Sequence, residues 1–345
     1  MAVTLLGLGL VVTATLVAVQ LTPGEIDRAE DPKVAEAAAA EDDQPRGSSK
    51  GAGPSEADRA ARSTAPFKVV PGLQLKKAPE EPEEPEADAL REAAEQEARR
   101  EVPISFKVGS FNVLGSQHTQ PGGIRASWPP ASTRTAGAAA ISAEHAVDVL
   151  GTQELQADQL RDLQNRTGMA AWPGFAWGEA ETDNSILWDP GLFELVEGSQ
   201  FTITFMGRPR PQAIVRLRHL DTGREFYVVN THPSAGDGRY TTERRNGQYA
   251  LVNVVNDLQT TGLPVIVTGD MNDRAAFYCN VVPAAGLVAS NGGSYGSGCQ
   301  PPPEPIAVDW VVGSGVTWST YWRDTRPIAR KISNHFFISA TANLG

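Results

Sequence analysis

Cysteine is scarce in this chain of 345 residues, which contains only Cys279 and Cys299. No spacing of cysteine and histidine predicts a zinc site. In an exported chain, an even number of cysteines suggests a disulfide. Closing a loop of this size would contribute roughly 3 kcal/mol to stability in the chain-entropy model. Two unrelated thiols remain the alternative.

Positive charge is also in short supply, because 30 lysines and arginines face 41 aspartates and glutamates. Much of the acidic excess precedes residue 104, so the remainder of the chain is only mildly acidic. A protein that binds long nucleic acid tightly and without sequence preference neutralises many phosphates with basic side chains. The composition weighs against that class of binding.

Some common catalytic signatures are missing as well. The chain has no HExxH, no GxGxxG and no GxxxxGK[ST]. These absences exclude the usual zinc peptidase, dinucleotide-binding and P-loop signatures.

The first 22 residues contain no charged side chain. That length suffices for a helix to cross the apolar core of a bilayer. A cleaved secretory signal is the alternative, although a basic n-region and a clear cleavage site are missing. We expect residues 1–22 to be a transmembrane anchor or signal segment, with the rest of the chain exported to the outer face of the cell membrane or secreted.

Residues 23–103 are rich in alanine, glutamate and proline and poor in large apolar side chains. Too little apolar surface is available there to offset the entropy lost on ordering, so we predict a disordered acidic linker. One stretch within it, residues 87–101, is rich in strong helix formers and could form a short helix.

From residue 104 to residue 345, apolar strand-like segments alternate with a few helical ones, which indicates a single α/β domain. Most strand candidates end in polar side chains. In layered α/β proteins such strand ends converge on one rim, where sites are commonly built. Residues of this kind are Asn112, Glu154, Asn230, His232, Asp270, Asn272, Asp309 and His335.

Taken singly, each of these residues could simply cap a turn or a helix. As a set they supply hard oxygen ligands, which suit Mg²⁺ or Mn²⁺, together with two histidines. Such a site could bind and polarise a phosphoryl group and activate a water for in-line attack.

The same residues carry a family resemblance over residues 104–345. The motifs are "GSFNVL", "DVLGTQEL", "VVNTH", "PVIVTGDMND", "VDWVV" and "SNH". In order and approximate spacing, the chain resembles the endonuclease/exonuclease/phosphatase superfamily, the DNase I-like proteins. The resemblance implies a four-layer α/β sandwich of two mixed β-sheets flanked by helices. It also implies metal-dependent hydrolysis of a phosphoester.

The resemblance further implies roles for individual residues. Glu154 would be the principal ligand of the metal, Mg²⁺ or Mn²⁺, with Asn112 beside it. Asp270 and Asn272 would orient or activate the attacking water, and Asp309 would support the metal or a catalytic histidine. The remaining expected roles are phosphate contact by His232 and His335, and substrate binding by Asn230, Asn184 and Arg134.

Asn334 departs from the family pattern, which is usually Ser-Asp-His. An amide adds no charge to stabilise an imidazolium, so we expect His335 to be less basic than in related proteins and the activity to be reduced or shifted in pH. A non-catalytic binding protein on the same fold is one alternative function for this reason.

The leading functional prediction is a divalent-metal-dependent phosphodiesterase, in the first place an extracellular nuclease. A phospholipid or sphingolipid phosphodiesterase, or a phosphatase, of the same fold is the second alternative, because an anchor would hold the site near lipid headgroups. The expected partners are a phosphoester substrate, either nucleic acid or a lipid headgroup, and a membrane through residues 1–22. No feature implies a stable protein partner.

Overall fold

The computed structural model describes residues 84–100 and 102–345. The predicted anchor or signal segment, residues 1–22, and the linker as far as residue 83 lie outside this part of the chain. Of the helices within it, none combines the length and the apolar character that crossing a bilayer requires.

Helix α1 (Glu84–Arg100) lies near the end of the segment 23–103, where the sequence suggested a short helix at residues 87–101. The helix coincides with the segment rich in strong helix formers. Alanine and glutamate lose little side-chain freedom in a helix, which favours this conformation even though residues 88–98 are exposed.

Two six-stranded mixed sheets form the centre of the described domain. The first sheet has the order β11 (Thr317–Asp324), β12 (Phe337–Leu344), β1 (Ile104–Asn112), β2 (Val149–Gln153), β4 (Ile186–Trp188) and β3 (Ala170–Trp172). The second has the order β5 (Phe193–Phe205), β6 (Arg208–His219), β7 (Glu225–Thr231), β8 (Val265–Asp270), β10 (Asp309–Ser314) and β9 (Val288–Ala289).

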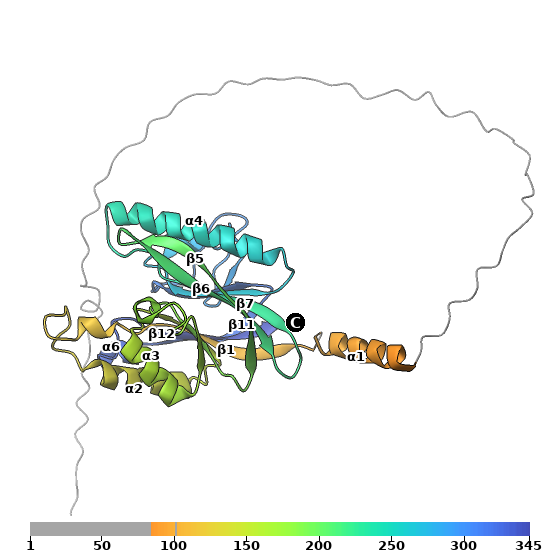
Figure 1. Ribbon diagram of the computed structural model, residues 1–345. Helices are drawn as coiled ribbons and strands as arrows, with labels where there is room; N and C mark the ends of the chain where they lie inside the picture. Colours follow the sequence, from red (N-terminus) through yellow and green to blue (C-terminus); the bar gives the residue numbers. More distant parts are fainter. Residues whose placement is uncertain (1–83, 101) are drawn as a thin grey trace, which may run out of the picture. The chain divides into compact units, whose positions relative to one another are not determined.

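The sheets lie between two helical layers (Figure 1). After α1, the longer helices are α2 (Ala131–Glu144), α3 (Ala157–Thr167) and α4 (Arg239–Gln259), and the shorter ones are α5 (Ala275–Asn280), α6 (Arg326–Ala329), η1 (Ser116–His118) and η2 (Glu179–Glu181). Figure 1 shows α4 on one outer side and α2 with α3 on the other. The predicted four-layer α/β sandwich is confirmed.

Successive side chains of the buried strands point to opposite faces of a sheet, which explains how each sheet packs against a layer on both sides. On β8, Val265 and Val267 pack with Leu251 of α4, while Ile266 points the other way, into the apolar layer between the sheets. Phe106 of β1 joins Ile266 in that central layer. Because successive side chains of a strand point to opposite faces, one wholly apolar strand can serve two cores.

The pairing of the strands brings their polar ends to one rim. In the first sheet β1 runs parallel to β2, and in the second β7 runs parallel to β8, so the carboxyl ends of each pair lie together. Strands β10 and β12 run antiparallel to β8 and β1, so their amino-terminal ends reach the same rim. The register places Asp309 directly opposite Asp270.

Cys279 of α5 and Cys299 of the following loop form a disulfide. The predicted pairing is therefore present, and the alternative of two unrelated thiols is wrong.

Candidate active site

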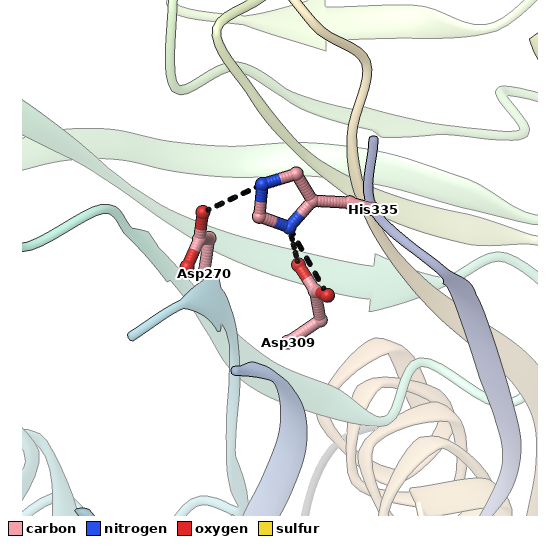
Figure 2. A group of neighbouring side chains, drawn as sticks. All are labelled: Asp270, Asp309 and His335. Atoms are coloured by element: carbon pink, nitrogen blue, oxygen red, sulfur yellow. Dashed lines mark hydrogen bonds and ion pairs between the residues drawn. The ribbon is translucent and has the colours of Figure 1, made fainter. Parts of the chain in front are cut away.

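His335 lies between two aspartates at the rim (Figure 2). Its Nδ1 is 3.0 Å from Oδ1 of Asp309, and its Nε2 is 3.5 Å from Oδ2 of Asp270. Burial by itself lowers the pKa of His335, but the charges of Asp309 and Asp270 outweigh it and raise the pKa to about 10. The ring is therefore held as an imidazolium at neutral pH.

This geometry corrects the expectation for Asn334. The carboxylate that supports His335 comes from Asp309, 26 residues earlier in the chain, and not from the adjacent position. Asn334 is exposed and lies at the cavity wall beside the ring. The expectation placed the supporting charge at residue 334, whereas Asp309 supplies it. That His335 is less basic than in related proteins stays a prediction.

His232 occupies the other side of Asp270, with its Nε2 3.4 Å from Oδ2. Its backbone N–H donates to Oε1 of Gln212 at 2.7 Å. The ring is 2 % exposed, packs against Phe205, and its buried Nδ1 has no hydrogen-bond partner among the described residues. A proton on Nδ1 would be a buried N–H without an acceptor, so the geometry favours a hydrogen on Nε2, which faces Asp270.

Asn112 connects Glu154 and Asp270. Its Nδ2 donates to Oε1 of Glu154 at 2.9 Å and to Oδ2 of Asp270 at 3.0 Å, while its Oδ1 accepts from the backbone N–H of Leu114. That backbone donor fixes which end of the amide is oxygen. The amide nitrogen faces the carboxylates, so in this geometry Asn112 is a bridging donor and not the expected oxygen ligand.

Glu154 receives two further contacts through Oε2, from the backbone N–H of Gly115 at 3.2 Å and from Nε2 of His118 at 3.1 Å. Burial by itself raises the pKa of Glu154, but the contact with His118 and the hydrogen bond from Asn112 hold it well below its ordinary value. The carboxylate is thus ionised and close to the cavity surface.

Two of the predicted residues have strained backbones. Glu154 has φ +59° and Asn272 has φ +47°, in the left-handed region that non-glycine residues seldom adopt. Asn272 is held there by its N–H, which donates to Oδ1 of Asp270, and by its Nδ2, which donates to the carbonyl of Pro233. Strain of this kind persists only where the surroundings enforce it, and it is concentrated at functional sites.

These groups open into a cavity of about 390 Å³. Its wall contains six of the predicted residues: Glu154, His232, Asp270, Asn272, Asn334 and His335. A second cavity of about 410 Å³ is lined by residues 144–145 and 322–326 and contains no strand-end residue of the predicted set. The first cavity is therefore the candidate active site.

Three residues expected to bind substrate lie elsewhere. Asn230 is 0 % exposed and ties the two sheets together, since its Nδ2 donates to the carbonyl of Thr152 and its Oδ1 accepts from Gln153. Asn184 is 3 % exposed and does not reach the cavity wall. These placements correct the expected substrate contacts of both amides.

Arg134 is the third residue that was expected to bind substrate. It is 1 % exposed, and its guanidinium donates to backbone carbonyls of residues 113–115 and of Ile332. Burial lowers its pKa. A guanidinium already committed to these carbonyls is not available to a phosphate, so the predicted phosphate contact by Arg134 is wrong.

Three titratable residues of the cavity were missed in the sequence: His118, Asp183 and Arg210. His118 follows a strand by several residues, so the strand-end pattern did not include it. Nη2 of Arg210 lies 2.9 Å from Oδ2 of Asp183, and its guanidinium stacks 4.0 Å above the ring of Phe205. Only the neighbourhood of Asp183 in "TDNSILW" offered a signal.

The donor set suits a divalent cation. Glu154 is an ionised carboxylate with its side chain 22 % exposed at the cavity, and Asp270 is close by through Asn112. Ligand atoms of Asp270, Asp309 and His335 also lie within 4.8 Å of one another. We assign that triplet to hydrogen bonding, because His335 uses both ring nitrogens on the carboxylates, and Glu154 to the metal.

Comparisons with known proteins agree with the fold. A family profile described as "Endonuclease/Exonuclease/phosphatase family" matches residues 109–335. A search of curated protein sequences found no match.

Solved structures share the fold at low sequence identity. An endonuclease/exonuclease/phosphatase family protein from Bacteroides thetaiotaomicron has a TM-score of 0.53 at 19% identity, over 71% of this chain and 96% of its own. The human Nocturnin catalytic domain with a bound sulfate anion has a TM-score of 0.54 at 18% identity, over 70% and 96%. The D. rerio protein TDP2 in complex with a single-strand DNA product has a TM-score of 0.51 at 18% identity, over 69% and 98%.

Proposed function

Because the chain belongs to the endonuclease/exonuclease/phosphatase family, we propose that it is a divalent-metal-dependent phosphodiesterase that cleaves nucleic acid outside the cell. The observation that carries the proposal is the imidazolium of His335, held between Asp309 and Asp270 at the wall of a cavity that also contains Glu154. A cation beside an ionised metal-binding carboxylate suits the charge that develops on a phosphoryl group.

The two histidines would act differently on the phosphate. His335 carries a fixed positive charge and could stabilise the developing negative charge or protonate a leaving oxygen. His232 offers an N–H from Nε2. A divalent cation held by Glu154 would polarise a phosphoryl oxygen.

Asp270 contacts both rings through Oδ2. The charge of His335 lowers its pKa to about 2 in spite of burial. A carboxylate this acidic is a weak base, so its proposed part is to fix the two rings and to accept a hydrogen bond from the attacking water.

The size and charge of the cavity bear on the substrate. Among the described residues that line it, Arg210 is the one arginine or lysine. Together with the imidazolium of His335 this makes two positive charges, which suit a few phosphates of a flexible strand better than a long duplex. The DNA product bound to the D. rerio relative supports a nucleic-acid substrate of this kind.

An extracellular location is supported by the disulfide between Cys279 and Cys299, since disulfides persist in oxidising compartments. The uncharged segment 1–22 is the expected means of export. The alternative of a non-catalytic protein was based on Asn334. It loses that basis because Asp309 supplies the charge at His335.

The test is hydrolysis by the full-length protein of labelled single-stranded DNA, RNA, sphingomyelin vesicles and inositol phosphates, with Mg²⁺ or Mn²⁺ and with EDTA. We expect cleavage of DNA or RNA that EDTA abolishes and that Asp270→Ala reduces by at least about 10²-fold. Asp257→Asn, an exposed position on α4, is the matched control and keeps full activity. If only sphingomyelin is hydrolysed, the proposed nuclease function is wrong and the protein is a lipid phosphodiesterase. If no phosphoester is hydrolysed, the proposal that the protein is an enzyme is refuted.

A further inference from the structure

His118 faces the carboxylate that we assign to the metal. Its Nε2 lies 3.1 Å from Oε2 of Glu154. The side chains of His118 and Glu154 are 28 % and 22 % exposed, and both line the cavity. Both side chains are thus accessible to an ion in the cavity.

The segment that carries His118 is held in place from several directions. Gly115 donates its N–H to Glu154 and accepts from the N–H of His118. Nη2 of the buried Arg134 donates to the carbonyl of Gly115 and to Oγ1 of Thr119, at either end of the short helix η1. Ser116 donates to Asp158 on α3. The imidazole is therefore positioned before any ligand binds, which lowers the cost of binding one.

We propose that His118 and Glu154 form a mixed nitrogen–oxygen ligand pair for the divalent cation, so that the centre selects a transition cation such as Mn²⁺ over Mg²⁺. The proposal rests on the proposed function in that it takes Glu154 as a metal ligand. Two ligand atoms that each lie about 2.1 Å from the same ion, with an angle of 90° between their bonds to it, are about 3.0 Å apart. The observed separation of 3.1 Å between Nε2 and Oε2 meets this condition without a movement of either element.

The nitrogen decides which cation is preferred. Mg²⁺ takes oxygen ligands and keeps several waters, whereas imidazole favours transition cations, and affinity for a given site rises from Mn²⁺ through Co²⁺. An all-oxygen centre at Glu154 would give His118 no influence on metal choice. The alternative is that His118 only donates a hydrogen bond to Glu154 and holds the carboxylate in position.

The test uses the full-length protein loaded with Mn²⁺, with affinity measured by electron paramagnetic resonance titration and ligation by electron spin echo envelope modulation. We expect wild-type protein to show ¹⁴N coupling to Mn²⁺, and His118→Gln to lose one coupled nitrogen and at least about tenfold in Mn²⁺ affinity. Mg²⁺ affinity, measured by competition, should change less than about twofold. His219→Gln, on a histidine at the far end of β6 that bonds Thr222, is the matched control and leaves both signals unchanged.

An unchanged nitrogen coupling or an unchanged Mn²⁺ affinity in His118→Gln overturns the ligand role. Glu154→Gln, which should abolish Mn²⁺ binding altogether, verifies that the site is the one observed. A wild-type protein that hydrolyses its substrate with Mg²⁺ and shows no nitrogen coupling refutes this inference alone. A protein that binds neither ion refutes the inference and the metal dependence of the proposed function together.

Discussion

Asp309 and His335 form an ion pair at the rim, with 3.0 Å between Oδ1 and Nδ1. Asp309 begins β10, and His335 comes just before β12, so the pair joins the two sheets. The positive charge of the site therefore depends on how the sheets are stacked.

Removing the carboxylate should lower the pKa of His335. In Asp309→Asn, burial remains and the largest opposing charge is lost, so we expect the pKa of the ring to fall from about 10 by at least about one unit. Nuclear magnetic resonance titration of the labelled imidazole measures it. Asn334→Asp is the matched comparison and should move the pKa less, because residue 334 is exposed. A larger effect of Asn334→Asp would contradict the assignment of Asp309.

Stability should fall in alkaline solution. The pKa of His335 is about 10 in the folded protein, and its ordinary value, which applies to the unfolded chain, is 6.5. Between pH 6.5 and 10 the folded protein therefore binds a proton at His335 that the unfolded chain does not. This contribution is complete below pH 6.5 and is lost as the pH rises through 10. The free energy of unfolding should decrease by at most about 1.4 kcal/mol per pH unit in this window. Urea unfolding of wild-type protein and His335→Gln between pH 7 and 10 measures it, and equal slopes for the two proteins would refute the expectation.

Arg134 should matter for stability and not through contact with substrate. Arg134→Met leaves the carbonyls of Val113, Leu114 and Ile332 without this donor in a buried place, so we expect the free energy of unfolding to drop by about 2–4 kcal/mol. Urea unfolding measures the loss. Arg166→Met, at an exposed arginine on α3, should cost less than about 1 kcal/mol. Full stability of Arg134→Met would show that its hydrogen bonds contribute little.

The disulfide should contribute through loop closure. Its half-cystines are separated by 20 positions, so replacing both by serine should cost about 3 kcal/mol in the free energy of unfolding. Urea unfolding of the double variant, and of wild-type protein kept in dithiothreitol, should give the same loss. A variant as stable as the wild type would mean that the loop is already restricted in the unfolded chain.

Much of the site could be predicted from the sequence, because the position of a strand and the residue type at its end depend on local sequence. Apolar runs ending in polar residues identified Glu154, Asp270, His232 and His335, and all four line the cavity. The same rule could not separate a residue facing the cavity from one facing the other sheet. Asn230 is an example of a residue that faces the other sheet. It ends an apolar run, but its side-chain amide forms hydrogen bonds with Thr152 and Gln153 of the opposing sheet and does not face the cavity.

Contacts between segments far apart in the chain could not be predicted from the sequence, for a physical reason. Which carboxylate meets His335, and that His118 reaches Glu154, depend on the register of paired strands and on the packing of one sheet over the other. Sequence by itself determined the composition of the rim: which strands end in acids, amides and imidazoles, and so which chemistry is available. Only the tertiary structure decided how charge is distributed there. An ionic interaction depends on distances of a few ångströms, and residues 26 positions apart acquire such a distance only when the sheets stack.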